Sequence, residues 1–181
     1  MAEGGGGADG PLEPLSQVTL ARIRRSREQY PSARSAVLPA LWAVQDQLGY
    51  LPPSGLAAVA RELGLEPSEV EAVSTFYSMY FQQQPGRHLI QVCLNVSCGL
   101  RGADQILRHL QEGLEVEEGG TTADGLFTLE GTVECLGGCG GAPMLQVDRI
   151  SYENLDPAAA AQVLAGVRKK DGAGRRGRRN A

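Results

Sequence analysis

The sequence lacks long apolar runs and an export signal, and both absences restrict where the protein can work. No apolar run among the 181 residues reaches the ~18 that a membrane-spanning helix needs, so we expect no direct membrane span. The chain starts MAEGGGGADG, without a charged segment followed by an apolar one. Nothing therefore marks it for export, and we expect a cytoplasmic protein.

A nucleotide-binding motif is also missing. The glycine run at residues 4–7 follows no predicted strand and lacks the Lys-Ser/Thr ending of a phosphate-binding loop. No G-x-G-x-x-G lies between a predicted strand and a predicted helix either. We therefore expect this chain to have no NAD or flavin site of its own.

Both ends of the chain are poor in apolar residues, whereas the middle has the composition of a globular protein. The whole sequence is 42% hydrophobic and 21% charged, which is ordinary for a folded domain. Residues 1–14 show no periodicity, so we expect them to be disordered. We expect the same of the basic tail, residues 169–181, which we interpret as a solubilising segment with no nucleic-acid partner.

Cysteine is scarce, and its placement is the most informative feature of the sequence. The four cysteines form two close pairs, Cys93 and Cys98 in QVCLNVSCGLRG, and Cys135 and Cys139 in VECLGGCGGAP. Such pairing predicts one site built from four thiolates. Glycines flank both pairs and allow backbone N–H groups to approach bound sulfur closely: Gly99, Gly137, Gly138, Gly140 and Gly141.

Three kinds of site use four cysteines. Structural disulfides suit small exported domains, which this chain does not resemble. Zinc sites usually pair their thiolates two to four residues apart. A [2Fe–2S] cluster is wider, because each cysteine pair must hold its own iron, and a C-x4-C step occurs among the ligands of plant-type ferredoxins. The spacing favours the cluster and leaves zinc open. His88 and His109 are not needed as ligands, and we expect both at the surface.

Residues 15–84 have the pattern of a small helical bundle. Helices are predicted around Val18–Glu28 and over two apolar stripes that end at Gly49 and Gly64, and another begins at Pro67. In this last helix we expect Phe76, Tyr77 and Tyr80 to pack in the core of the bundle. We expect the helix to end at Tyr80-Phe81. The stripes are Val37, Leu38, Leu41, Val44 and Leu48, then Leu56, Val59, Ala60 and Leu63.

Residues 85–168 predict a mixed domain with the order strand, helix, strand, strand, helix. The run His88–Val92 is a strand that leads to the first cysteine, and a helix begins at Ala103 and stops at Gly113. Alternation at Phe127, Leu129 and Val133 predicts the strand that leads to Cys135. A hairpin turns at Asp148-Arg149, and the last helix is capped by Asp156. This order is compatible with a thioredoxin-like sheet.

Three motifs occur in the order and spacing of a known family. VSTFYSMY, the C-x4-C followed by LRGAD, and VECLGGCGGAP closely resemble the E-type subunit of bacterial NADH-quinone oxidoreductase, the small [2Fe–2S] subunit of respiratory complex I. The resemblance runs from about Tyr30 to Val167. It implies an α+β or α/β fold, with an N-terminal helical bundle followed by a thioredoxin-like [2Fe–2S] ferredoxin domain.

The resemblance also implies a role. The family's cluster ligands correspond to Cys93, Cys98, Cys135 and Cys139, which would hold one [2Fe–2S] cluster per chain. FMN and NADH would lie on a flavoprotein partner, and further partners would be the other peripheral-arm subunits of complex I, at the inner face of the cell membrane. The chain would then be an electron carrier within a proton-translocating enzyme. Similar subunits occur in NAD-dependent formate dehydrogenases and NAD-linked hydrogenases, so the parent complex stays open.

Overall fold

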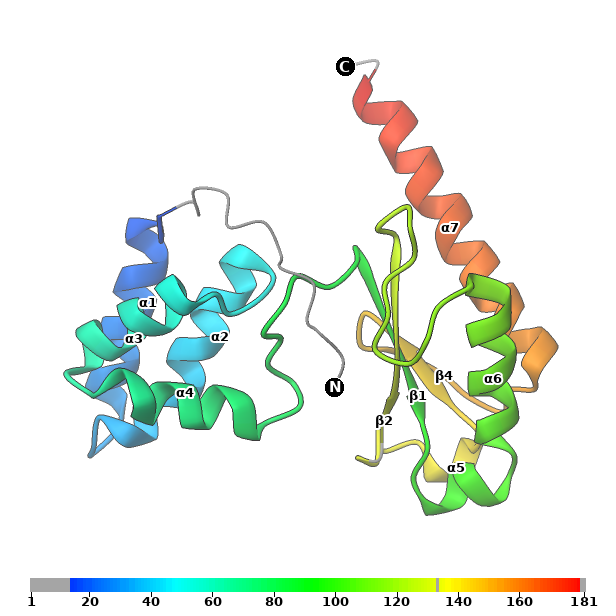
Figure 1. Ribbon diagram of the computed structural model, residues 1–181, viewed down its shortest axis with the longest axis horizontal. Coiled ribbons are helices and arrows are strands. Elements are labelled where there is room, and N and C mark those ends of the chain that lie inside the picture. The colour runs from blue at the N-terminus through cyan, green and yellow to red at the C-terminus, as the bar shows by residue number, and fades with distance from the viewer. Residues whose placement is uncertain (1–13, 133, 180–181) are drawn as a thin grey trace, which may run out of the picture. The chain divides into compact units, whose positions relative to one another are not determined.

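The computed structural model describes residues 14–132 and 134–179. The chain divides into two compact units, Met1–Gln84 and Pro85–Ala181 (Figure 1). The start predicted to be disordered, residues 1–14, lies outside the described residues except for Pro14, as do Val133 of a predicted strand and residues 180–181 of the basic tail. Across the described parts of the chain, no helix combines the length and apolar character needed to cross a membrane.

The first unit consists of helices α1 (Gln17–Gln29), α2 (Val37–Leu48), α3 (Pro53–Leu63) and α4 (Pro67–Phe76), with a 3-10 turn η1 (Arg34–Ala36) before α2. Gly49 and Gly64 adopt left-handed conformations directly after α2 and α3, so the predicted ends of both helices are confirmed. The predicted stripes face a common core, whose fully buried members include Ile23, Val37, Leu41, Val44, Val59 and Val70.

The prediction for the aromatic residues after α4 was wrong for two of the three. The helix ends at Phe76, and Tyr77 has an extended backbone. The Phe76 side chain is 78% exposed and that of Tyr77 is 37% exposed. Only Tyr80 is buried, and its hydroxyl donates to the Leu38 carbonyl at 2.9 Å.

A side chain on α2 explains why the helix does not continue to Phe81. The Gln45 amide nitrogen donates to the Met79 carbonyl, and its oxygen accepts the Phe81 N–H, both at 2.9 Å. The Leu51 N–H donates to the Phe81 carbonyl at 2.8 Å. These bonds hold the segment after α4 against α2 in a non-helical path, which the helical spacing of the aromatic residues did not reveal.

The second unit is a four-stranded sheet with helices. Its elements are β1 (His88–Cys93), α5 (Val96–Leu100), α6 (Ala103–Leu114), β2 (Phe127–Thr132), the 3-10 turn η2 (Cys139–Gly141), β3 (Leu145–Val147), β4 (Ile150–Tyr152) and α7 (Pro157–Arg179). The strand order is β2-β1-β3-β4, with β1 parallel to β2 and antiparallel to β3. β1 is therefore a central strand, and it ends at Cys93.

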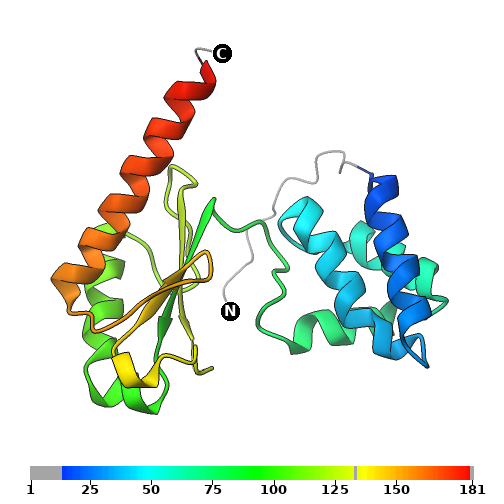
Figure 2. The ribbon, with the colours of Figure 1, turned by 180° about the vertical axis from the view of Figure 1, so that it is seen from behind.

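Helices α6 and α7 cover the same face of this sheet (Figures 1 and 2). The alternate residues Ile90 and Val92 of β1 join the core beneath these helices, together with Leu129 of β2. Ile106 of α6 and Leu164 of α7 close that core from above. The register places Leu89, Gln91 and Cys93 on the opposite face, because side chains alternate along a strand.

Two local predictions in this unit had different outcomes. α6 does not stop at Gly113; it ends at Leu114, and Glu115 takes the left-handed conformation that follows the helix. The hairpin between β3 and β4 is confirmed. Its turn residues Asp148 and Arg149 have φ values of 51° and 69°, so the turn forms without glycine.

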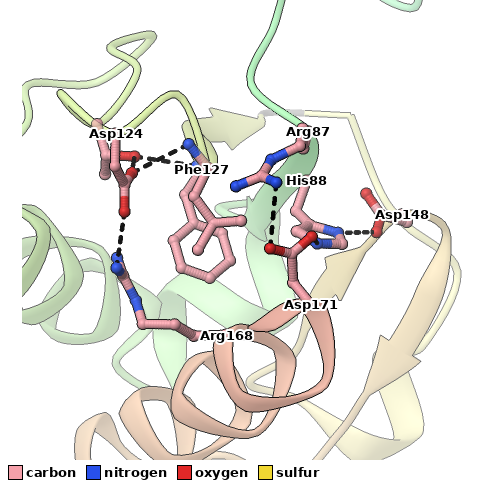
Figure 3. Close-up of polar contacts among 9 residues, drawn as sticks. Arg87, His88, Asp124, Phe127, Asp148, Arg168 and Asp171 are labelled. Carbon is pink, nitrogen blue, oxygen red and sulfur yellow. Dashed lines mark hydrogen bonds and ion pairs between the residues drawn. The ribbon is translucent and has the colours of Figure 1, made fainter. Parts of the chain in front are cut away.

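The last helix extends through most of the segment that was predicted to be disordered. α7 continues through residue 179, well past Lys169. Two ion pairs anchor it (Figure 3): Arg168 lies 2.7 Å from Asp124, and Asp171 lies 3.2 Å from Arg87. These partners are more than 40 residues away in sequence, so the charge pattern of the tail alone did not predict the contacts.

His88 is not the simple surface residue that was expected. Its side chain is 21% exposed and lies between two carboxylates (Figure 3). Nδ1 is 2.6 Å from Asp148 Oδ2, and Nε2 is 3.8 Å from Asp171 Oδ1. His88 therefore helps to connect the start of β1 with the hairpin turn and α7, whereas His109 is exposed as expected.

Candidate metal centre

The first cysteine pair is built into the sheet domain. Cys93 ends the central strand β1 and is 1% exposed, and Cys98 in α5 is 2% exposed. α5 begins after Asn95, whose side-chain oxygen accepts the Val96 N–H at 2.9 Å. This short helix turns the chain back, so that both sulfurs join one buried cluster of side chains.

The second cysteine pair lies on the connection between β2 and β3. Cys135 and Cys139 are both exposed, and their sulfurs are 3.3 Å apart. Gly137, between them, has φ of +87°, a conformation that side chains disfavour. A Cβ atom at Gly137 or Gly140 would have nothing within 4 Å, so the backbone of this loop is open on that side.

Backbone bonds fasten the second loop to the first cysteine. The Cys93 N–H donates to the Met144 carbonyl at 3.2 Å, after the loop. The Leu94 N–H donates to the Thr132 carbonyl at 2.7 Å, before it. These bonds attach both ends of the second loop to the carboxyl end of β1, although more than 30 residues separate the two pairs in the sequence.

The four thiols differ in their electrostatic surroundings. Burial raises the pKa of Cys98, and the neighbouring Cys93 and Cys139 add to that rise. The backbone N–H of Gly137 lowers the pKa of Cys135, with smaller contributions from Cys139 and Cys93. Cys135 in turn raises the pKa of Cys139. Two of these influences run from one pair to the other, that of Cys139 on Cys98 and that of Cys93 on Cys135.

The donor set fits a two-iron group better than a single ion. Four thiolates in two pairs match the ligand requirement of a [2Fe–2S] cluster. Among the described residues, no group of three or more His, Cys, Asp or Glu side chains is arranged to hold a metal ion, and that holds for zinc and for iron alike. The Gly137 N–H bonds to the Cys135 thiol, a contact of the kind that adjusts the properties of sulfur ligands.

Three further residues contact the second loop, and sequence reasoning did not single them out. The Arg101 guanidinium donates through Nε to the Ala142 carbonyl at 2.6 Å. Met144 is 1% exposed and packs with Cys93 and Cys98. Glu153 lies against the glycines of the loop. Arg101 and Glu153 stand in the motifs LRGAD and YENLDP, but only the fold shows which loop they touch.

Comparison with protein families gives a match over most of the chain. Residues 23–168 match the model of the thioredoxin-like [2Fe-2S] ferredoxin family. The E-type subunit 2 of the NADH-quinone oxidoreductase of Rhizobium meliloti (strain 1021) is 42% identical over 146 residues, which cover 81% of this chain and 86% of that protein. The E-type subunit of the NADH-quinone oxidoreductase of Escherichia coli (strain K12) is 38% identical over 150 residues, covering 83% and 90%.

Solved structures share the fold. A crystal structure of an NAD+-reducing [NiFe]-hydrogenase in the air-oxidized state superposes with a TM-score of 0.63 at 23% identity. The match covers 80% of this chain but only 24% of the matched hydrogenase chain. The same enzyme type in the H2-reduced state gives a TM-score of 0.62 at 25% identity.

Proposed function

Since the chain belongs to the thioredoxin-like [2Fe-2S] ferredoxin family, we propose that it is the E-type electron-transfer subunit of an NADH-quinone oxidoreductase. The observation that supports the proposal is that backbone bonds attach the loop of Cys135 and Cys139 to the end of β1, where Cys93 packs with Cys98. Cys93 and Cys98 would hold one iron of the cluster, and Cys135 and Cys139 would hold the other. When bound, the [2Fe–2S] cluster takes up and releases one electron at a time.

We propose that NADH oxidation takes place on a partner subunit and that this chain only carries electrons. NADH delivers a hydride, which carries two electrons, and a flavin normally separates them. The sequence has no nucleotide-binding motif. The partner is therefore a flavoprotein subunit that binds NADH and FMN, alongside other peripheral-arm subunits of the complex. Through that complex the chain lies at the inner face of the cell membrane.

The helical unit carries the surface proposed for the flavoprotein. Phe76, Tyr77 and Met79 are 78%, 37% and 40% exposed; Phe76 is the last residue of α4, and the other two lie in the segment after it. The rings of Phe76 and Tyr77 meet edge to face at 5.0 Å. Exposed aromatic and methionine side chains are typical of the centres of protein interfaces.

An NAD-linked hydrogenase is the alternative parent complex for this chain, because the same fold occurs within an NAD+-reducing [NiFe]-hydrogenase. In that complex the chain would pass electrons to or from a hydrogenase module. Purification of the assembly from its own cells, followed by identification of the co-purified subunits, decides between them. Quinone-module and membrane subunits favour the first assignment, and a nickel-containing subunit would replace it with the second.

The test of the core proposal combines metal analysis with reduction by NADH. Anaerobically purified protein should contain two irons and two acid-labile sulfides per chain, as the cluster requires. NADH should bleach its visible absorption only when the flavoprotein is added. One zinc without sulfide would refute the cluster, and reduction of the isolated chain by NADH would refute the division of labour.

The docking surface has its own test within the same assay. Phe76→Ser should weaken binding to the flavoprotein by about 30-fold, the effect of losing an interface anchor worth about 2 kcal/mol. Val18→Ser is the matched control, because Val18 is 71% exposed on α1 of the same unit. Equal affinities of the two variants would place the interface elsewhere.

A further inference from the structure

A glutamate from the end of the sheet lies across the loop that carries the second cysteine pair. A Cβ atom built at Gly141 would overlap the Glu153 Oε2 atom and lie 2.8 Å from its Cδ. A Cβ atom at Gly138 would lie 3.1 Å from Glu153 Oε1. The carboxylate therefore occupies space that side chains at these two positions would otherwise fill.

The backbone around Glu153 fixes this placement. The Asn154 N–H donates to the Gly141 carbonyl at 2.6 Å, and the Leu155 N–H donates to the Pro143 carbonyl at 3.0 Å. Asn154 has φ of +52°, which turns the chain after Glu153 toward α7. Main-chain hydrogen bonds hold this segment against the loop, so a substitution that changes only the charge of the Glu153 side chain leaves those bonds in place.

The position brings a negative charge close to the proposed cluster. Gly141 is two residues from Cys139, so the carboxylate lies within roughly 10 Å of that sulfur. One-electron reduction adds a negative charge to the site, and the exposed Glu153 carboxylate opposes that change. Arg101 contacts the same loop with a guanidinium, whose positive charge acts in the opposite direction. The loop is thus in contact with one negatively charged side chain, Glu153, and one positively charged side chain, Arg101.

We propose that the charge of the Glu153 carboxylate lowers the midpoint potential of the cluster. The potential is then below the value that the four thiolates and the surrounding backbone alone would give. This inference rests on the proposed function, because it requires the cluster on the four cysteines. From Coulomb's law at about 10 Å, the carboxylate disfavours reduction by about 2- to 15-fold in the equilibrium constant.

Glu153→Gln is the decisive variant, because it removes the charge and keeps the shape. The midpoint potential is measured on the full chain by titration with dithionite, which supplies the electron, through redox mediators. The potential of Glu153→Gln should become more positive, and Glu153→Asp should lie closer to the unchanged protein. In high salt the difference should shrink, because screening acts on a charge and not on a packing contact.

Glu112→Gln is the matched control. Glu112 is an exposed carboxylate of the same unit, and it lies nine residues along α6 from Ala103, or about 14 Å. Its replacement should shift the potential less than Glu153→Gln does, because the charge is farther from the four cysteines and solvent ions screen it more.

Two results would overturn the inference. One is an unchanged potential in Glu153→Gln with an unchanged electron paramagnetic resonance spectrum. The other is loss of the cluster in Glu153→Gln alone, which would give the residue a purely structural role. Iron and sulfide analysis of the unchanged protein separates these results from failure of the proposed function, in which that protein itself lacks a cluster.

Discussion

The two cysteine pairs are held in opposite ways. Cys93 and Cys98 are almost completely buried, one at the end of a central strand and the other in a short helix. Cys135 and Cys139 are exposed on a glycine-rich loop. The first pair is part of the packed interior, whereas the second pair depends on the loop's backbone and on its clamp to neighbouring segments.

This difference separates two properties that one site must combine. The buried pair gives the site a rigid base, because packed interiors resist displacement. The exposed pair leaves one side of the site accessible to a redox partner. Substitutions at the first pair should therefore affect the fold as well as the site, and those at the second pair should affect the site alone.

The strongest test is replacement of each cysteine by serine. All four variants should lose most of their iron and sulfide, because oxygen donors suit iron–sulfur clusters poorly. Only Cys93→Ser and Cys98→Ser should also lower the free energy of unfolding of the metal-free protein, by about 1–3 kcal/mol, because they bury a hydroxyl among apolar groups. Urea unfolding of the four metal-free variants makes the comparison. Equal stabilities would show that burial of the first pair does not matter for the fold.

Two glycines of the second loop allow a finer test. A Cβ at Gly138 would overlap Met144 Sδ, whereas one at Gly140 would meet nothing within 4 Å. Gly138→Ala should therefore lower the free energy of unfolding of the cluster-containing protein by about 1–3 kcal/mol through overpacking. It should also change the midpoint potential of the cluster. Gly140→Ala should leave stability within about 0.5 kcal/mol. Thermal unfolding and redox titration are the measurements, and matching behaviour of the two variants would contradict the close approach of Met144.

Alkylation of the metal-free protein compares the pairs without mutation. Iodoacetamide should modify Cys135 and Cys139 at least about tenfold faster than Cys93 and Cys98, because reagent access follows exposure. Mass spectrometry of peptides at successive times gives the four rates. Similar rates at all positions would mean that the first pair is open in the metal-free protein.

The pH dependence of the same reaction gives the smallest expected difference. The thiolate is the reactive form. The Gly137 N–H lowers the pKa of Cys135, so its rate should reach a plateau at lower pH than that of a free thiol. Burial raises the pKa of Cys98, so the alkylation rate of Cys98 should still increase with pH where that of Cys135 has reached its plateau. The reverse order of the two profiles would contradict these surroundings.

Much of the fold was predictable because local signals agree with tertiary structure. Helical spacing with a glycine after it located α2 and α3, a short apolar run located β1, and alternation located β2. The failures share a cause. Gln45 redirects the chain after α4, and Arg87 and Asp124 hold α7 beyond Lys169. Each of these contacts joins residues that are more than 30 positions apart.

The site shows the same limit. The paired spacing predicted which cysteines form the site, and that assignment stays a prediction. The structure places Cys93 and Cys98 in one buried cluster and the sulfurs of Cys135 and Cys139 3.3 Å apart. The sequence did not reveal that one pair is buried and the other exposed. It also did not reveal Glu153, because the bonds that place its neighbours on the loop connect segments about a dozen residues apart.

The bonds that fasten the second loop to both sides of Cys93 have a consequence for biosynthesis. All four cysteines have been translated once Cys139 is made, but Met144, which closes the loop against Cys93, follows later. The clamp at Asn154 and Leu155 follows later still. A nascent chain that ends shortly after Cys139 therefore has every ligand without the frame that orders them. Cluster insertion should wait until the hairpin β3–β4 has left the ribosome and paired with β1.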